Sequence, residues 1–237
     1  MLKKIISFIP SSSHEEGIFD PPVLTKKIIP EWYVKQNKYT DGRKSHSIEN
    51  GNINHTIKGC MPVFDIMTAG YTITLPADVL FSKEDDGSVA TVWSSNSISL
   101  IESHPIEQYN EFNTSKEFFE IGFKFINPWI IKTPPGYSCL FIHPSYRDDL
   151  PFQTLSAVVD TDKHPISVNF PFFIRKDFEG ILPMGTPIVQ VIPFKRDSWK
   201  HVVEKNTRID LVKIWKKAEG KMSNRYKTFF RSNKEWS

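Results

Sequence analysis

The chain has 237 residues, of which 39% are hydrophobic, 24% charged and 13% aromatic, values typical of a globular protein that exclude wholesale disorder. Seventeen prolines against 11 glycines indicate many rigid turns and weigh against long helices. No stretch approaches the roughly 20 apolar residues of a membrane-spanning helix, and the apolar run Ile5–Ile9 is too short for a signal peptide. We therefore expect a soluble, intracellular protein.

The charges are distributed unevenly. Residues 195–237 carry 13 basic and 5 acidic side chains, a balance of +8, whereas residues 1–194 carry 17 and 22, a balance of −5. The sequence thus indicates a mildly acidic body with a basic tail, which suits nucleic acid, an acidic partner or a sister subunit.

The two cysteines, Cys60 and Cys139, form neither a disulfide framework nor a zinc pattern, so buried, inert thiols in a reducing compartment are expected.

In chain order, Ile5–Ile9 is typical of a first strand, and Trp32 and Tyr33 follow a rigid turn at Pro30. An exposed Trp-Tyr pair would suit peptide docking, but we favour burial over one end of the core. Tyr39–Asn54 is polar and predicts a loop, and Val63–Ala69 predicts one helical turn that Gly70 closes.

Short strands are predicted next, because apolar and polar residues alternate over a few positions and then meet a breaker. These strands are Tyr71–Leu75, Val89–Trp93, Ile98–Ile101 and Phe118–Ile126. Trp93 and Trp129 are the expected anchors of the core.

The stretch Thr133–Arg196 consists of short β-branched and aromatic runs separated by Pro, Gly and Asp. No helix of ordinary length fits between those breakers. The runs Val158–Val159, Val168–Phe170 and Ile188–Phe194 therefore predict strands, and the chain as a whole is predicted to be mainly β.

After Arg196 the pattern becomes helical. Asp197 or Ser198 is a suitable cap for one kinked helix or two short ones that end at Gly220. The apolar residues of this segment are Trp199, Val202, Val203, Ile209, Val212 and Trp215. Tyr226, Phe229 and Phe230 then form an i, i+3, i+4 stripe among basic residues. Such a stripe suits single-stranded nucleic acid, but we favour docking on this chain or on a neighbour. The predicted organisation is a β body over residues 1–196 and a helical, basic and aromatic arm over residues 197–237.

Catalytic motifs are scarce. The sequence lacks GxSxG, HExxH, a Walker loop and a dinucleotide fingerprint. His14, Glu16 and His201, with Arg208, imitate a non-haem iron facial triad, but they fall in a predicted loop and a predicted helix. Paired Asp160 and Asp162 follow a strand, where they either position a water molecule or satisfy their own turn.

The Asp160 segment also carries a resemblance to a known family. Ala157–Asp162, Ile166–Val168 and Ile181–Val191 resemble the closing half of the dUTPase and dCTP-deaminase superfamily, and Pro135–Ser145 resembles the strand that leads into its phosphate motif. The match covers about residues 133–194. It implies a β-clip fold, an antiparallel barrel over about residues 56–196, and a homo-oligomer, with a trimer favoured and ligand sites between subunits.

Important residues of that family are replaced here. Lys163 stands where the family has a base-stacking tyrosine, and Pro165 stands where it has a glycine that lets the backbone approach the base. The resemblance implies Asp160 as the water-positioning catalytic residue. It implies ligand or phosphate contacts at Ser145, Arg147, Asp162, Lys163, Gln190 and Arg196. No metal site and no cofactor are expected, apart from Mg²⁺ accompanying a bound nucleotide.

The whole chain, with its Lys-Gly-Cys-Met-Pro and Thr-Pro-Pro-Gly-Tyr-Ser stretches, is also similar to an uncharacterised family from tailed phages and some bacteria. That similarity implies the host cytoplasm or a virion as its location, and a phage or host protein as a further partner. Two hypotheses follow. The favoured one is a non-catalytic, self-associating binding or assembly protein whose arm clasps a neighbour. The other is a divergent nucleotide-binding hydrolase or deaminase, so the sequence leaves open whether the chain is an enzyme.

Overall fold

The computed structural model describes residues 4–12, 19–40, 48–49, 52–53, 55–94, 99–109, 112, 115–120, 122–203 and 226–237. The chain divides into two compact units that are each built from distant segments. The first unit comprises Met1–Thr25 and Gly70–Arg196, and the second comprises Lys26–Ala69 and Asp197–Ser237. Among the described residues, no helix has the length and apolar character needed to cross a membrane.

Strands and turns fill the whole stretch from Thr133 to Arg196, as its breakers predicted. Its strands are β11 (Tyr137–Ile142), β12 (Phe152–Thr154), β13 (Ala157–Val159), β14 (Phe170–Ile174), β15 (Gly180–Leu182) and β16 (Pro187–Lys195). Gly136 and Gly185 occupy turns with φ of 83°, a conformation that side chains other than glycine rarely adopt. The absence of helix from this stretch confirms the prediction.

The longest strand, β16, lies inside a five-stranded antiparallel sheet of order β13-β11-β16-β5-β2. Strand β5 spans Tyr71–Thr74 and strand β2 spans Val23–Leu24. The register of β16 against β5 shifts between Pro187 and Val189, which is a β-bulge. The buried Thr154 hydroxyl donates to the carbonyl of Ile188 at this bulge, over 2.6 Å. A side chain from another sheet thereby satisfies the backbone where the ladder is irregular.

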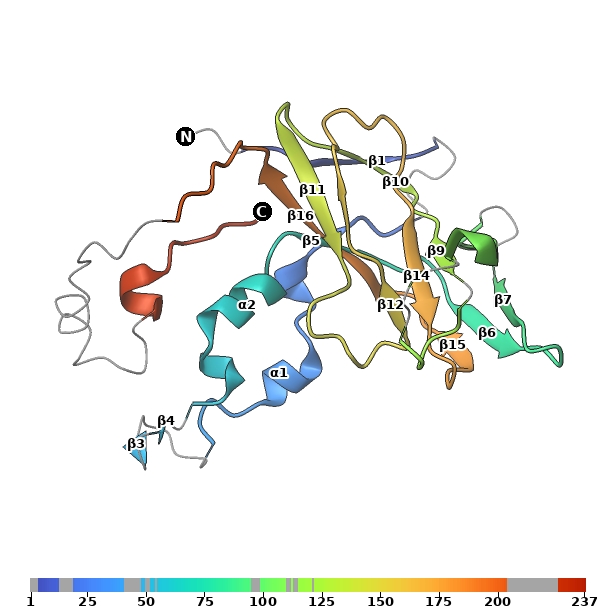
Figure 1. Ribbon diagram of the computed structural model, residues 1–237, viewed down its shortest axis with the longest axis horizontal. Coiled ribbons are helices and arrows are strands. Elements are labelled where there is room, and N and C mark those ends of the chain that lie inside the picture. The colour runs from blue at the N-terminus through green and yellow to red at the C-terminus, as the bar shows by residue number, and fades with distance from the viewer. Residues whose placement is uncertain are drawn as a thin grey trace. The chain divides into compact units, whose positions relative to one another are not determined.

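Three further antiparallel sheets complete the first unit (Figure 1). Their orders are β12-β14-β9-β8, β15-β6-β7 and β1-β10. The added strands are β1 (Ser7–Pro10), β6 (Val79–Lys83), β7 (Val89–Trp93), β8 (Ile101–Ser103), β9 (Phe123–Phe125) and β10 (Trp129–Lys132). Among the described strands, none of these sheets closes into a barrel. The mainly β prediction is therefore confirmed, whereas in place of the expected antiparallel barrel the described strands form separate open sheets.

One aromatic-rich core joins these sheets. Phe125 stacks on Phe172 with ring centroids 3.8 Å apart, and Phe152 meets both rings edge-on. Trp129 belongs to the buried core, and Trp93 packs against it from a partly buried position. The two tryptophans thus anchor the core as the sequence predicted.

Three predicted strands are shorter or displaced. Ile98 and Ile121 lie outside the described residues, but among the described ones the strand expected over Ile98–Ile101 begins at Ile101, and the one expected over Phe118–Ile126 covers Phe123–Phe125. The strand expected over Val168–Phe170 begins only at Phe170. Phe118 makes an isolated bridge to Arg175 instead, and Phe119 packs against the core from a turn. Side-chain alternation located these apolar faces, but it did not determine where backbone pairing begins.

The second unit contains short helices. They are the helices α1 (Glu31–Lys35) and α2 (Met61–Met67), the tight turn η3 (Ile57–Gly59) and the single turn η6 (Tyr226–Phe230). A small hairpin joins β3 (Ile48–Glu49) to β4 (Asn52–Ile53). The tight turn η2 (Thr25–Lys27) crosses from the first unit into the second, and η4 (Ile106–Tyr109) belongs to the first. The helical turn predicted before Gly70 corresponds to α2.

Tyr33 is buried within this unit and stacks on Phe64 of α2, with centroids 6.2 Å apart. Trp32 keeps 40% of its surface exposed. The expected burial of the pair is therefore confirmed for Tyr33 only. Tyr33 covers α2 within its own unit.

The helix predicted from Asp197 or Ser198 does not begin there. Residues 197–203 have no helical structure, and Trp199 is 92% exposed, so its apolar face finds nothing to pack against. Residues 204–225, which hold the remainder of that prediction, lie outside the described residues. The aromatic stripe at Tyr226–Phe230 does form a helical turn, yet its rings remain about half exposed.

The end of the chain docks on α2 through charge. Arg231 Nη2 lies 2.7 Å and Lys234 Nζ 2.8 Å from the carboxylate of buried Asp65. Lys26 Nζ donates to the Trp236 carbonyl over 3.2 Å. Hydrogen bonds from Arg231 lower the pKa of Asp65, so this carboxylate stays ionised between its two cations. The tail thus docks on its own chain through Arg231 and Lys234, and not through the apolar stripe on which the prediction rested, because the three rings of that stripe remain about half exposed.

Candidate functional site

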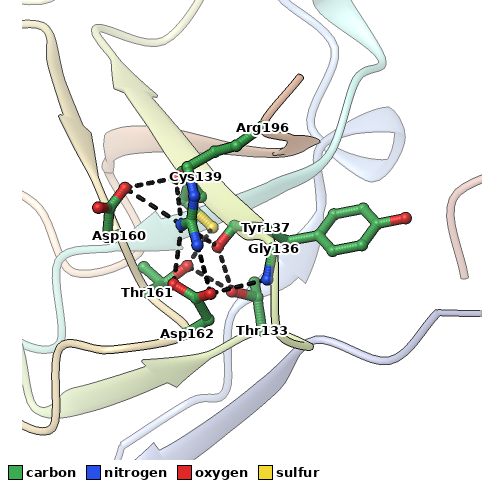
Figure 2. A network of polar contacts seen from close by, with 9 residues as sticks. Thr133, Gly136, Tyr137, Cys139, Asp160, Thr161, Asp162 and Arg196 are labelled. Atoms are coloured by element: carbon green, nitrogen blue, oxygen red, sulfur yellow. Dashed lines mark hydrogen bonds and ion pairs between the residues drawn. The ribbon is translucent and has the colours of Figure 1, made fainter. Parts of the chain in front are cut away.

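Arg196 is the centre of a polar cluster at the end of β16. Its backbone N–H donates to the Gly136 carbonyl over 2.9 Å, which places its side chain over the start of β11. Nη1 donates to the Tyr137 carbonyl at 3.0 Å and to Ser138 Oγ at 2.9 Å. Figure 2 shows the guanidinium pointing between the carboxylates of Asp160 and Asp162, while the Tyr137 ring points away from the cluster.

The turn after β13 supplies both carboxylates. Asp162 makes a two-pronged pair with Arg196, at 2.8 Å from Nη1 and 2.5 Å from Nη2, and also accepts the Gly136 N–H at 2.8 Å. Asp160 accepts Ser138 Oγ at 2.7 Å and lies 3.2 Å from Arg196 Nη1. One arginine therefore serves both acidic residues of the turn.

The two carboxylates differ in their surroundings. The Asp162 side chain is only 5% exposed, and its hydrogen bonds from Arg196 lower its pKa to about 2. The Asp160 side chain is 52% exposed. A carboxylate that is held ionised by an arginine is a poor proton acceptor near neutral pH, which leaves Asp160 as the accessible acidic group.

A layer of hydroxyl and thiol groups lies beside this cluster. Thr133 Oγ1 and Thr161 Oγ1 are 2.7 Å apart, and Thr161 Oγ1 donates to Cys139 Sγ over 3.4 Å. Burial raises the pKa of the Cys139 thiol to about 11, so the thiol is inert as predicted. Cys60 is partly buried. The threonines fix the turn that presents Asp160 and Asp162.

A second polar cluster lies at the other end of β11. The side-chain carbonyl of fully buried Gln190 accepts the Ser145 backbone N–H at 3.2 Å and the Ser145 hydroxyl at 2.8 Å. These bonds hold the loop that follows β11, in which Tyr146 adopts a φ of 58°. Gln190 and Ser145 thus have a structural function in shaping a strained turn.

His143 supports the same loop. Its Nδ1 accepts the Thr154 backbone N–H at 3.2 Å, so the ring proton is on Nε2, which lies 3.3 Å from the Arg147 carbonyl. Burial lowers the pKa of His143 and keeps the ring neutral. Arg147 pairs with Asp149 in its own loop, at 2.8 Å through both Nε and Nη2. Hydrogen bonds from Arg147 lower the pKa of Asp149.

The structure brings some of the residues predicted to contact a ligand together and keeps others apart. Asp160, Asp162 and Arg196 come together, and Ser145 meets Gln190, whereas Arg147 pairs with its own loop and Lys163 is exposed. The two clusters lie at opposite ends of β11. Ser138 pairs with Phe194 and Ile142 pairs with Gln190. Four residues of strand separate these two positions by about 13 Å.

Sequence reasoning missed Ser138, Gly136, Thr133 and Thr161 as members of the Arg196 cluster. One signal was present for Ser138, since it is the polar residue of the apolar strand Tyr137–Ile142 and is fully buried. A buried hydroxyl requires a partner. That partner, Asp160, is 22 residues away in the sequence.

The facial-triad hypothesis gains nothing from the geometry. His14, Glu16 and Arg208 lie outside the described residues, and His201 is exposed in an irregular segment. Among the residues that the structure describes, no three His, Cys, Asp or Glu side chains are grouped so as to hold a metal ion.

Comparisons with known proteins add no assignment, because no family model, no curated protein and no solved structure matches this chain. The resemblance to the dUTPase superfamily therefore stays a prediction from the residues quoted for it. The class that the structure itself defines is a mainly β protein of open antiparallel sheets with a salt-bridged turn at Arg196.

Proposed function

We propose that this chain is a non-catalytic, self-associating binding or assembly protein built on a scaffold related to the β-clip fold. The observation that carries the proposal is the engagement of Arg196 by Asp160 and Asp162. In the family that the sequence resembles, Asp160 would position a water molecule and a basic residue would meet a phosphate. Here the arginine nearest to Asp160 is already paired, so the phosphate contact competes with an internal ion pair.

Electrostatics supports the same conclusion. The cluster of Asp160, Asp162 and Arg196 carries two carboxylates and one guanidinium, and the lowered pKa of Asp162 keeps its carboxylate ionised at neutral pH. The cluster is therefore net negative and repels a triphosphate. Arg147 is the other arginine that was predicted to contact phosphate, and it is paired with Asp149. A nucleotide would have to displace both pairs, each of which is a charge-assisted bidentate contact.

The remaining parts of the proposal rest on the sequence resemblances. Lys163 and Pro165 replace the tyrosine and glycine of the family's nucleoside pocket. These replacements favour a protein that keeps the family's scaffold but not its nucleotide chemistry. A phage or prophage setting, in the host cytoplasm or a virion, and a trimeric assembly are proposed on the same basis. The Lys- and Arg-rich tail is proposed to meet a partner rather than a substrate.

The alternative, a divergent nucleotide-binding enzyme, is favoured by one observation: the half-exposed Asp160 carboxylate lies next to a guanidinium. Thermal unfolding with 1 mM of each deoxynucleotide, with and without Mg²⁺, separates the two functions. A nucleotide bound at tens of micromolar would stabilise the fold by about 2–3 kcal/mol, a rise of several degrees in Tm. We expect no rise. A rise that Asp160→Asn or Arg196→Gln abolishes would overturn the non-catalytic proposal.

Self-association has its own test. Sedimentation velocity of the full chain over a hundredfold range of concentration should show a mass larger than one chain, with three chains the expected limit. A single species at the mass of one chain throughout that range contradicts self-association.

A further inference from the structure

The sheet β15-β6-β7 has an apolar row on its outward face. Ile181 lies opposite Leu80, and Leu80 lies opposite Val92, so the three side chains share one face of the sheet. They are 60%, 41% and 58% exposed, respectively. Phe81, one residue along from Leu80, faces the core and is 1% exposed. The outward face of an antiparallel sheet normally carries polar residues. Leu80, Val92 and Ile181, which we call the Leu80 row, instead expose apolar side chains to water, and burying them in a contact would be favourable.

Acidic side chains lie in the segments that precede and join the strands of the Leu80 row. The hairpin that joins β6 to β7 carries Glu84, Asp85 and Asp86, all exposed, with Lys83 beside them at the end of β6. Exposed Asp78 precedes β6, and exposed Glu179 precedes β15. The rim of the row is therefore net negative and suits a partner with basic side chains.

A segment with the complementary chemistry follows β16. Residues 197–203, the Trp199 arm, have no helix or strand, and Trp199, Val202 and Val203 are 92%, 66% and 85% exposed. Tryptophan brings a large apolar area when it is buried, and it is the side chain most enriched among interface hot spots. The arm itself carries one acidic and one basic side chain, Asp197 and Lys200. The chain that follows it, residues 204–237, carries 10 basic and 4 acidic side chains, and of the basic ones Arg231 and Lys234 are paired with Asp65.

We propose that the Trp199 arm of one copy docks on the Leu80 row of a second copy. This inference rests on the proposed self-association and names the surfaces that produce it. Apolar side chains meet apolar side chains at the centre of the contact, and the basic end of one chain meets the acidic rim of the next. Because the arm and the row are different residues, two copies join either reciprocally in a two-fold dimer or head to tail, and a head-to-tail contact closes into a ring when the rotation between copies permits.

The test uses the full chain and four variants. Ile181→Lys places a charge in the Leu80 row, and Ile166→Lys is its matched control, since Ile166 is 64% exposed and lies outside the row. Trp199→Ser removes the centre of the arm, and Trp199→Phe keeps an aromatic ring there. Both isoleucines and Trp199 are exposed, so the variants should fold, which circular dichroism and thermal unfolding check.

Analytical ultracentrifugation should show that Ile181→Lys and Trp199→Ser each weaken self-association by about 30-fold or more, the loss typical of a hot-spot residue. Ile166→Lys and Trp199→Phe should associate within about threefold of the parent chain. A mixture of the Ile181→Lys and Trp199→Ser chains should form a complex of one copy of each. The first chain keeps its arm and the second keeps its row, which leaves one complete contact and no route to a ring.

Each other outcome overturns the inference. If Ile181→Lys alone dissociates the assembly, the rows pack on each other without the arm. If Trp199→Ser alone does so, the arm docks elsewhere. If neither variant differs from an associating parent chain, self-association stands but uses another surface. A parent chain that stays at the mass of one copy overturns the proposed self-association and this contact together.

Discussion

Gly70 connects α2 to β5 at a point where a side chain has no room. Its φ is 69°, and a Cβ added there would lie 2.1 Å from the carbonyl oxygen of Val191 and 3.2 Å from the Cα of Ile192. Val191 is fully buried in β16, which pairs with β5 on one side and β11 on the other. The obstructing atom is therefore backbone in an interior strand, and it cannot move aside without disturbing two ladders.

Gly87 is the matched control for this position. Its φ is 82°, but a Cβ added there would meet nothing within 4 Å. Gly87→Ala should therefore cost only the left-handed backbone penalty, about 1–2 kcal/mol. Gly70→Ala should cost that amount plus the overpacking of a dense interior, about 1–3 kcal/mol more. The difference between the two variants isolates the steric contribution at Val191.

Urea unfolding followed by tryptophan fluorescence measures both free energies of unfolding. We expect Gly70→Ala to lose at least about 1 kcal/mol more than Gly87→Ala, a further fall of about 2–4 °C in Tm for a chain of this size. Equal losses for the two variants would refute the steric reasoning, because only the backbone conformation would then matter.

Three further predictions concern the charged and thiol groups. The parent chain should lose stability as pH falls from about 4 towards 2, because Asp162, with a pKa of about 2 in the fold, is more easily protonated when unfolded. The free energy of unfolding, measured by urea titration at a series of pH values, should depend less on pH over that window in Asp162→Asn than in the parent chain. An unchanged dependence would argue against the Arg196 pair. Cys139 should react with a thiol dye only at the rate of unfolding and after Cys60, so early labelling of Cys139 contradicts its burial. Asp65→Ala, which removes the charged hydrogen bonds to the C-terminal segment, should cost about 1–3 kcal/mol and speed proteolysis of that segment, whereas unchanged cleavage would show that docking does not depend on Asp65.

Much of the strand pattern could be predicted from the sequence. The segment Tyr71–Thr74 alternates, the segment Val89–Trp93 pairs with the strand before it, and the Thr133–Arg196 stretch contains strands, turns and irregular segments without a helix. Local steric preferences and side-chain period act over a few residues, so a single sequence is enough to detect them. The start of the helix expected from Asp197 is the counterexample, because residues 197–203 are not helical. Trp199 is almost fully exposed there, and an apolar face without a packing surface does not stabilise a helical turn.

The candidate site was predictable only in part. Asp160, Asp162 and Arg196 were each identified, yet their mutual ion pairing depends on β11 pairing with both β13 and β16. That pairing brings Arg196 to a turn 34 residues earlier in the chain and buries Ser138 beneath it. Ser145 and Gln190 were grouped with the same site, although the strand register places them at the far end of β11.

The sequence by itself determined the mainly β character, the positions of the turns, the anchoring tryptophans and the inert Cys139, because each depends on the covalent chemistry of neighbouring residues. Only the tertiary structure decided that the sheets stay open, that Arg196 pairs with both carboxylates of the acidic turn, and that the Leu80 row and the Trp199 arm remain exposed. Ion pairing and burial depend on which groups lie close together in the folded chain. They follow from which strands become neighbours, and the spacing of residues along the chain does not specify that choice.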